Sequence, residues 1–297
     1  MSIPITRNPL TIESSLDSLE ISRRRESLQK KATAYYEKLQ IPNNDQSVVV
    51  AIDPVKSSGF AALSRTSWKS FGVVAVHPFL VMSPDDFPEE LRLNGLNDPL
   101  LCNRAHIMKI GRWLGKTFRV HEIGKPEEIQ SLLFSYLAIW ENPEALEDVR
   151  NSILAHEVAH FFHNHKNFLQ SWPERLTLAA GVCSAITGAF TSSFSTTLLS
   201  TLLVTANVFS VSEKLRCHIS RKNEKEADLT GLRLTGTTKG AEVFFSACQK
   251  ADRAIQKANS WRNFLDPTRL NPSKVLDGDH PAPLDRIAYL KAAQSEA

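Results

Sequence analysis

Hydrophobic positions recur along the chain at two spacings, one typical of helices and one typical of strands. Most segments repeat apolar side chains every three or four residues. The segments with this helical spacing are 11–40, 104–115, 126–140, 143–163, 241–258 and 284–293, and the charged segment 220–228 is also predicted to be a helix. Short runs of apolar residues at 48–52 and 72–76 instead predict strands, and 61–63 is a third candidate. The pattern therefore predicts an α+β protein that is mainly helical and has one small β-sheet.

Turn residues suggest how the chain is divided. The sequence Ile-Pro-Asn-Asn-Asp at 41–45 is typical of a turn, so we expect a helical N-terminal extension at 1–45 and one domain at 46–297. Within this domain, residues 83–142 predict a helical insertion that either covers a cleft or adds an accessory layer. A chain of 297 residues is long enough for a substantial hydrophobic core.

Residues 176–212 contain no charged side chain. They can form a hairpin of two helices, each of about 18 residues, near the lower limit for crossing a bilayer. Arg175, Lys214 and Arg216 would then hold both ends on the cytoplasmic side. A buried hairpin packed on the helices predicted at 143–163 and 220–228 is the alternative. Because both halves are short and rich in hydroxyl groups, we favour a soluble or peripherally attached hairpin, with membrane contact through 176–212 left open.

Charge and cysteine content narrow the function classes. The net charge of +3 is too small, and the basic residues too scattered, to indicate a nucleic-acid-binding protein. The four cysteines lie far apart without a C-x-x-C pair, so neither a disulfide framework nor a thiolate zinc site is expected. The first ten residues include two prolines and no apolar run, so no signal peptide is predicted. We therefore expect a cytoplasmic protein, free or attached to the cytoplasmic face of a membrane.

The helix predicted at 143–163 carries the pattern His-Glu-x-x-His. Residues four apart leave the same helix face, so His156 and His160 can supply two of the four ligands of a tetrahedral zinc ion. Glu157 lies beside them and can act as the general base that takes a proton from the attacking water. Three fixed residues in five also arise by chance on a solvated helix, so a third ligand is needed before the motif indicates a metal site.

A third ligand can come from the segment 220–228. On a helix Glu224 and Asp228 lie one turn apart on the same face, where Glu224 can bind the metal and Asp228 can accept the free ring N–H of a ligand histidine. His163 and His165 are closer in sequence. However, the metzincin pattern would place its third histidine at position 166, which is a lysine here, so we interpret both as ordinary residues at the end of the helix.

These motifs, followed by His280-Pro281 and by Arg286 in the last helix, resemble in order those of the forty-eighth metallopeptidase family. That gluzincin family includes the CAAX prenyl endopeptidases, the HtpX-type heat-shock membrane proteases and the Oma-type mitochondrial proteases. The resemblance implies a zincin-like fold with a small sheet beside the metal-binding helix. It also implies one Zn²⁺ per chain, held by His156, His160 and Glu224.

The same resemblance assigns the remaining site residues. Glu157 would be the general base, Asp228 would support a ligand histidine, and His280 and Arg286 would line the cleft. There they could stabilise the oxyanion, or His280 could close over the metal as a latch. We therefore expect a zinc endopeptidase that acts on proteins or peptides, with protein quality control as a candidate role. The alternatives are a zinc-stabilised binding or chaperone-like scaffold and a membrane-attached interaction protein without proteolysis.

Overall fold

The structure is a computed structural model that describes most of the chain. The described residues are 18–39, 48–52, 61–65, 72–118, 125–163, 172–191, 193–259 and 280–296. Two compact units are distinguished by how their residues pack. The first comprises Met1–His163, Ala227–Leu276 and Ala282–Ala297, and the second comprises Asn164–Glu226 and Asp277–Pro281.

The first unit contains one sheet of three strands, β1 (Val48–Ile52), β2 (Ala61–Arg65) and β3 (Gly72–Val76). The strand order is β1-β3-β2, with β1 parallel and β2 antiparallel to the central β3. Valine and isoleucine, which fit a pleated and half-buried surface, dominate β1 and β3. The predicted small sheet is thus confirmed.

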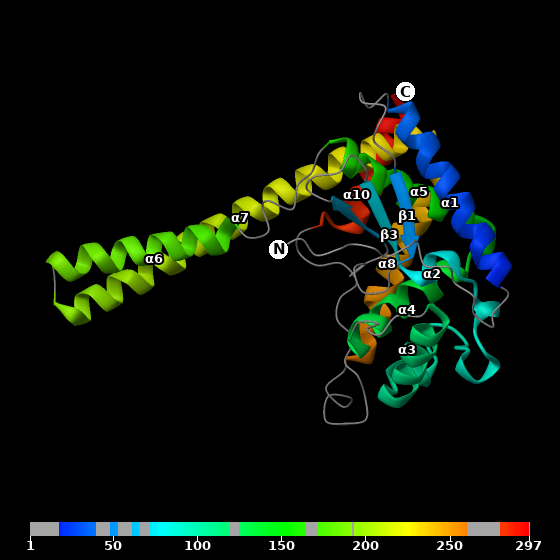
Figure 1. The fold of residues 1–297 in the computed structure, drawn as a ribbon, viewed down its shortest axis with the longest axis horizontal. Helices are drawn as coiled ribbons and strands as arrows, with labels where there is room; N and C mark the ends of the chain where they lie inside the picture. Colours follow the sequence, from blue (N-terminus) through cyan, green and yellow to red (C-terminus); the bar gives the residue numbers. More distant parts are fainter. Residues whose placement is uncertain are drawn as a thin grey trace, which may run out of the picture. The chain divides into compact units, whose positions relative to one another are not determined.

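Helices make up most of the first unit (Figure 1). The α-helices are α1 (Ser18–Lys38), α2 (Pro78–Val81), α3 (Arg104–Phe118), α4 (Pro126–Trp140), α5 (Leu146–Phe162), α8 (Lys239–Ala258) and α10 (Pro283–Ser295). Three-ten helices are η1 (Pro84–Asp86), η2 (Glu89–Leu91), η3 (Pro99–Cys102) and η4 (Pro143–Ala145). The mainly helical α+β class predicted from the sequence is therefore confirmed.

The helix that carries the histidine motif begins later than its sequence pattern predicts. Residues from Pro143 to Ala145 form η4, and α5 begins at Leu146. The Asn142 side chain makes no capping hydrogen bond, whereas its carbonyl accepts from the amide of Ala145 at 3.0 Å. This spacing of three residues is the three-ten pattern, so the α-helical hydrogen bonds start only after one tighter turn.

The core lies where α4 and α5 each pack on α8. Leu154 and Val158 of α5 and Tyr136 and Ile139 of α4 are fully buried. Every residue of α4 from 129 to 139 is buried, although this helix belongs to the segment interpreted from sequence as an insertion. The second half of that segment is therefore part of the core rather than an added layer.

Helix α1 covers one edge of the sheet and packs on α5. The amide of Val50 in β1 donates to the side-chain oxygen of Gln29 at 2.7 Å, and Lys31 donates to the side chain of Asn151 on α5 at 2.7 Å. The outer edge of β1 is thus held by a helix. The outer edge of β2 has no strand partner among the described residues.

The second unit contains a helical hairpin. Helix α6 (Trp172–Thr191) runs antiparallel to the first part of α7 (Phe194–Thr235), and the two lie side by side (Figure 1). A Cβ added at Gly188 would lie 2.5 Å from Cγ2 of Thr197, which shows how closely the two helices approach. Helix α7 continues past the hairpin without interruption and contains both Glu224 and Asp228.

Candidate metal centre

Helix α5 brings both histidines of the motif to the edge of the core. Val149 and Ile153 are buried, and His156 and His160 follow on neighbouring turns as half-buried side chains. The helical period explains this placement, because residues three and four apart share one face. Glu157, also half-buried, is the next residue after His156 on the same helix. The apolar positions of α5 thus anchor the helix, and its histidines remain within reach of solvent.

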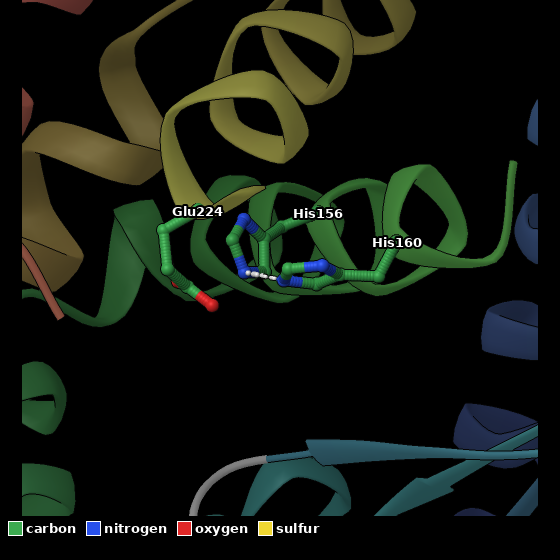
Figure 2. A group of neighbouring side chains, drawn as sticks. All are labelled: His156, His160 and Glu224. Atoms are coloured by element: carbon green, nitrogen blue, oxygen red, sulfur yellow. Dashed lines mark hydrogen bonds between the residues drawn. The ribbon is translucent and has the colours of Figure 1, made fainter. Parts of the chain in front are cut away.

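Three ligand atoms converge, one from each of His156, His160 and Glu224 (Figure 2). The Nε2 atoms of the two histidines lie 3.0 Å apart, and their rings are perpendicular with centroids separated by 4.5 Å. Glu224 is only 7% exposed, although it is a carboxylate. All three ligand atoms lie within 4.8 Å of one another. Two nitrogens and one oxygen at these separations can surround a single small cation.

Asp228 fixes the orientation of the first histidine. Its Oδ1 lies 2.8 Å from Nδ1 of His156, and its two oxygens accept hydrogen bonds from Nε and Nη2 of Arg286 at 2.7 and 2.6 Å. The hydroxyl of Tyr289 also donates to Asp228. Burial raises the pKa of Asp228, but the contacts with His156 and Arg286 outweigh it and hold the pKa at about 2. The carboxylate is therefore ionised at neutral pH.

This donor set fits zinc. Because Asp228 occupies Nδ1 of His156, that nitrogen carries the proton and Nε2 presents its lone pair toward His160. Tetrahedral zinc with Zn–N bonds of about 2.0–2.1 Å places two nitrogen ligands roughly 3.3 Å apart, close to the observed separation. Two imidazoles and one carboxylate also leave the fourth position open, as in catalytic zinc sites.

Comparison with protein families identifies the domain that contains these residues. The family model described as Peptidase family M48 matches residues 139–294, just over half of the chain. The chain belongs to Peptidase family M48. The matched range includes helices α5 to α8 and most of α10. It contains all three candidate ligands and Asp228. Comparison with curated proteins finds no match, and neither does comparison with solved structures.

Membership of the M48 family makes the protein a zinc metalloendopeptidase, a hydrolase that binds protein or peptide substrates. The family match rests on the sequence, whereas the convergence of His156, His160 and Glu224 is a property of the structure. Both point to the same metal site. The resemblance noted from the motifs is thus confirmed.

His280 lies against one of the metal ligands of the M48 site. Its Nδ1 is 3.0 Å from Oε2 of Glu224, and its side chain is about one-third exposed. A carboxylate has two oxygens, so Glu224 can face His280 with one and a metal with the other. His280 therefore contacts the metal site through Glu224 in this structure.

Arg286 occupies a different position from the one expected. It is 4% exposed, both ends of its guanidinium fork bind Asp228, and its guanidinium carbon lies 4.3 Å from the centre of the Phe245 ring. Because the side chain is almost completely buried, its guanidinium is not open to a substrate oxyanion in this structure. The geometry places Arg286 behind the ligands rather than along a cleft.

His163 also has a structural partner. Its Nε2 lies 2.8 Å from the hydroxyl of Thr230, which is buried on α7. This contact joins the end of α5 to α7 two residues after Asp228. His165 lies outside the described residues.

Two residues at the site were not identified from the sequence. Tyr289, which donates to Asp228, lies three residues after Arg286 on α10, and this helical spacing is the signal that could have found it. Gly231 faces α5, where an added Cβ would lie 3.3 Å from the backbone nitrogen of His156. A glycine here allows α7 to approach the histidine helix closely.

Proposed function

We propose that this M48 peptidase cleaves internal peptide bonds with Glu157 as general base and one zinc ion per chain held by His156, His160 and Glu224. The observation that carries the proposal is the convergence of those three ligand atoms within 4.8 Å. Zinc bound there would polarise the scissile carbonyl and lower the pKa of a water molecule. The adjacent Glu157 carboxylate would accept a proton from this water as its oxygen bonds to the carbonyl carbon.

The same residue would complete the reaction. When the C–N bond breaks, the leaving amine needs a proton, and protonated Glu157 would donate the one it accepted. Asp228 would keep His156 in the tautomer that exposes Nε2, with Arg286 and Tyr289 holding Asp228. His280 would hold the Glu224 carboxylate in place. In this assignment Arg286, Tyr289 and His280 are positioning residues.

We further propose that substrates bind as extended chains along β2. The outer edge of β1 is held by α1 through Gln29, whereas β2 pairs only with β3 among the described strands and packs on α5. An extended peptide can add to such an edge through main-chain hydrogen bonds, which do not depend on its sequence. Unfolded protein segments would then be the substrate class, which suits a role in protein quality control.

Degradation of casein, an unstructured protein, tests the proposal. Purified wild type and Glu157→Gln are compared with zinc supplied and with bound zinc measured in both. The proposal expects cleavage by the wild type only, and equal zinc in the two proteins, because Glu157 is not a ligand. Cleavage by Glu157→Gln at the wild-type rate would rule out its role as base. Bound zinc without cleavage in either protein would favour a binding scaffold.

A further inference from the structure

The hairpin of α6 and α7 has its apolar side chains on the outside. Every leucine, isoleucine and phenylalanine between residues 176 and 212 is exposed, including Phe190 at 86% and Phe194 at 82%. Along α6 the exposed apolar residues Leu178, Val182, Ile186 and Phe190 recur every four residues. A hairpin in water would bury this face, because exposed apolar area on such a scale is unfavourable.

The contact between the two helices has the opposite composition. The positions that α6 and α7 bury against each other carry mostly small or hydroxyl side chains. They include Thr177, Gly181, Gly188, Thr197, Thr201 and Thr205. A Cβ at Gly181 would lie 3.0 Å from the hydroxyl of Thr205. Helices that associate inside a bilayer use such small and hydroxyl-bearing contacts, because lipid already solvates the large apolar side chains.

Polar groups on the outside of the hairpin find partners within their own helix. The hydroxyl of Thr187 donates to the carbonyl of Cys183 at 2.9 Å, and that of Ser200 donates to the carbonyl of Thr197 at 3.0 Å. The side-chain amide of Asn207 donates to the carbonyl of Leu203 at 2.8 Å. These groups therefore need no water to satisfy their donors, which removes the main cost of transferring them into hydrocarbon.

Length and charge also match a bilayer. Helix α6 has 20 residues, of which 176–191 are uncharged. At about 1.5 Å per residue this uncharged part spans roughly 24 Å, most of the hydrocarbon core of about 30 Å. Helix α7 is long and apolar enough to cross a membrane. Charged residues resume only at the ends, with Glu174 and Arg175 before the hairpin and Glu213 and Lys214 after it. Arg175 and Lys214 are exposed, and basic residues beside a membrane segment favour the cytoplasmic side.

We infer that the α6–α7 hairpin is embedded in the hydrocarbon of a lipid bilayer, with both of its ends on the cytoplasmic face. The uncharged turn between the helices enters the membrane first, and the exposed leucine, isoleucine and phenylalanine side chains contact the acyl chains. The inference replaces the soluble or peripheral hairpin favoured from the sequence. It concerns membrane attachment and does not depend on proteolytic activity.

Cys183 provides a native probe, because it is exposed on α6. The full chain is synthesised with or without vesicles of phosphatidylcholine and phosphatidylglycerol, and flotation separates the protein that is bound to vesicles. Both samples are then treated with a charged, membrane-impermeant maleimide. The amount of maleimide on Cys183 is the total labelling of the wild type minus that of Cys183→Ala. We expect it to fall severalfold with vesicles and to return on denaturation. The control is Lys214→Cys in the Cys183→Ala background, which should float with the vesicles and remain reactive.

Three outcomes would overturn the inference. Flotation with unchanged labelling of Cys183 would mean that the protein is attached only at the membrane surface. Protection of Cys183 without vesicles, together with a doubled molecular mass, would mean that a second copy of the chain covers the hairpin. Failure to float at all would exclude the bilayer as the partner.

Discussion

Replacing Arg286 by methionine removes a buried charge partner and keeps an apolar side chain of similar length. Arg286 and Asp228 are 4% and 6% exposed, and two hydrogen bonds of 2.7 and 2.6 Å join them. Methionine retains the contact with the Phe245 ring, which lies 4.3 Å from the guanidinium carbon. The substitution therefore isolates the loss of the ion pair, and Asp228 remains as a buried carboxylate.

The structure sets the expected size of the effect. Breaking a buried ion pair by removing one partner costs about 3–5 kcal/mol, because the other charge is left without compensation. Tyr289 and His156 still contact Asp228, so we expect the free energy of unfolding to fall by about 3 kcal/mol, the lower end of this range. Zinc affinity should fall roughly 10- to 100-fold, as for other residues that orient a metal ligand.

Acid sensitivity should change in the same variant. The pKa of Asp228 is lower in the folded protein, at about 2, than its ordinary value of 3.8. Its ionised form therefore stabilises the fold above pH 4, and this contribution is lost as the pH falls toward 2. Without Arg286 the pKa of Asp228 in the folded protein rises, so it differs less from the pKa in the unfolded chain. The variant should therefore lose less stability than the wild type when the pH is lowered.

Urea unfolding of the chelator-treated proteins measures the stability, and competition with a zinc chelator measures the affinity. The double variant Arg286→Met/Asp228→Asn, which removes the unpaired charge, should recover at least half of the lost stability. A loss below about 1 kcal/mol in Arg286→Met, with unchanged zinc affinity, would refute the reasoning, because that value is typical of an exposed pair.

Three further predictions concern other parts of the molecule. Burial lowers the pKa of His77 from 6.5 to about 3, so each pH unit below 6.5 should cost up to about 1.4 kcal/mol of stability; urea unfolding at pH 7 and pH 5 should show a smaller difference for His77→Gln, and an equal difference would contradict this. In Gly240→Ala the new Cβ would lie 2.0 Å from the carbonyl oxygen of Asp148, so thermal unfolding should show a loss of about 3 kcal/mol, whereas Gly111→Ala, which meets only the end of the Ile129 side chain, should change stability by less than about 1 kcal/mol. Removal of zinc with a chelator should abolish casein cleavage and lower the melting temperature, because a ligand at 100 times its Kd stabilises the folded state by about 2.7 kcal/mol; both should return on adding zinc, and cleavage that persists without metal would contradict the assignment.

The sequence singled out the residues of the candidate metal cluster because their spacing follows from helix geometry. His156 and His160 are four residues apart on one helix, and Glu224 and Asp228 are four apart on another. Each pair is thus fixed by local structure. Only the meeting of the two helices had to come from the resemblance to known motifs, and the structure adds Gly231 as a reason why α7 can approach α5 closely.

Other features depend on partners that no local pattern shows. Arg286 has the same sequence spacing whether it faces a cleft or Asp228, and only the fold reveals the bidentate pair. The sequence of α4 suggested an insertion, because no local pattern shows that this helix is buried against α8, which is distant in the sequence. The hairpin is a separate case. Its hydroxyl groups suggested an aqueous environment, whereas the structure places most of them between the helices or bonds them to their own backbone.

The most direct test of the metal centre is the zinc affinity of Glu224→Gln measured against that of Glu226→Gln. Both residues are on α7, but Glu224 is buried beside His156 and His160 while Glu226 is partly exposed two residues away. For Glu224→Gln the account predicts a loss of zinc affinity of about 100-fold or more, because even residues that only orient a metal ligand typically cost about 10- to 100-fold. It predicts wild-type affinity for Glu226→Gln. Equal zinc affinity in the two variants would contradict the assignment of Glu224 as the third ligand.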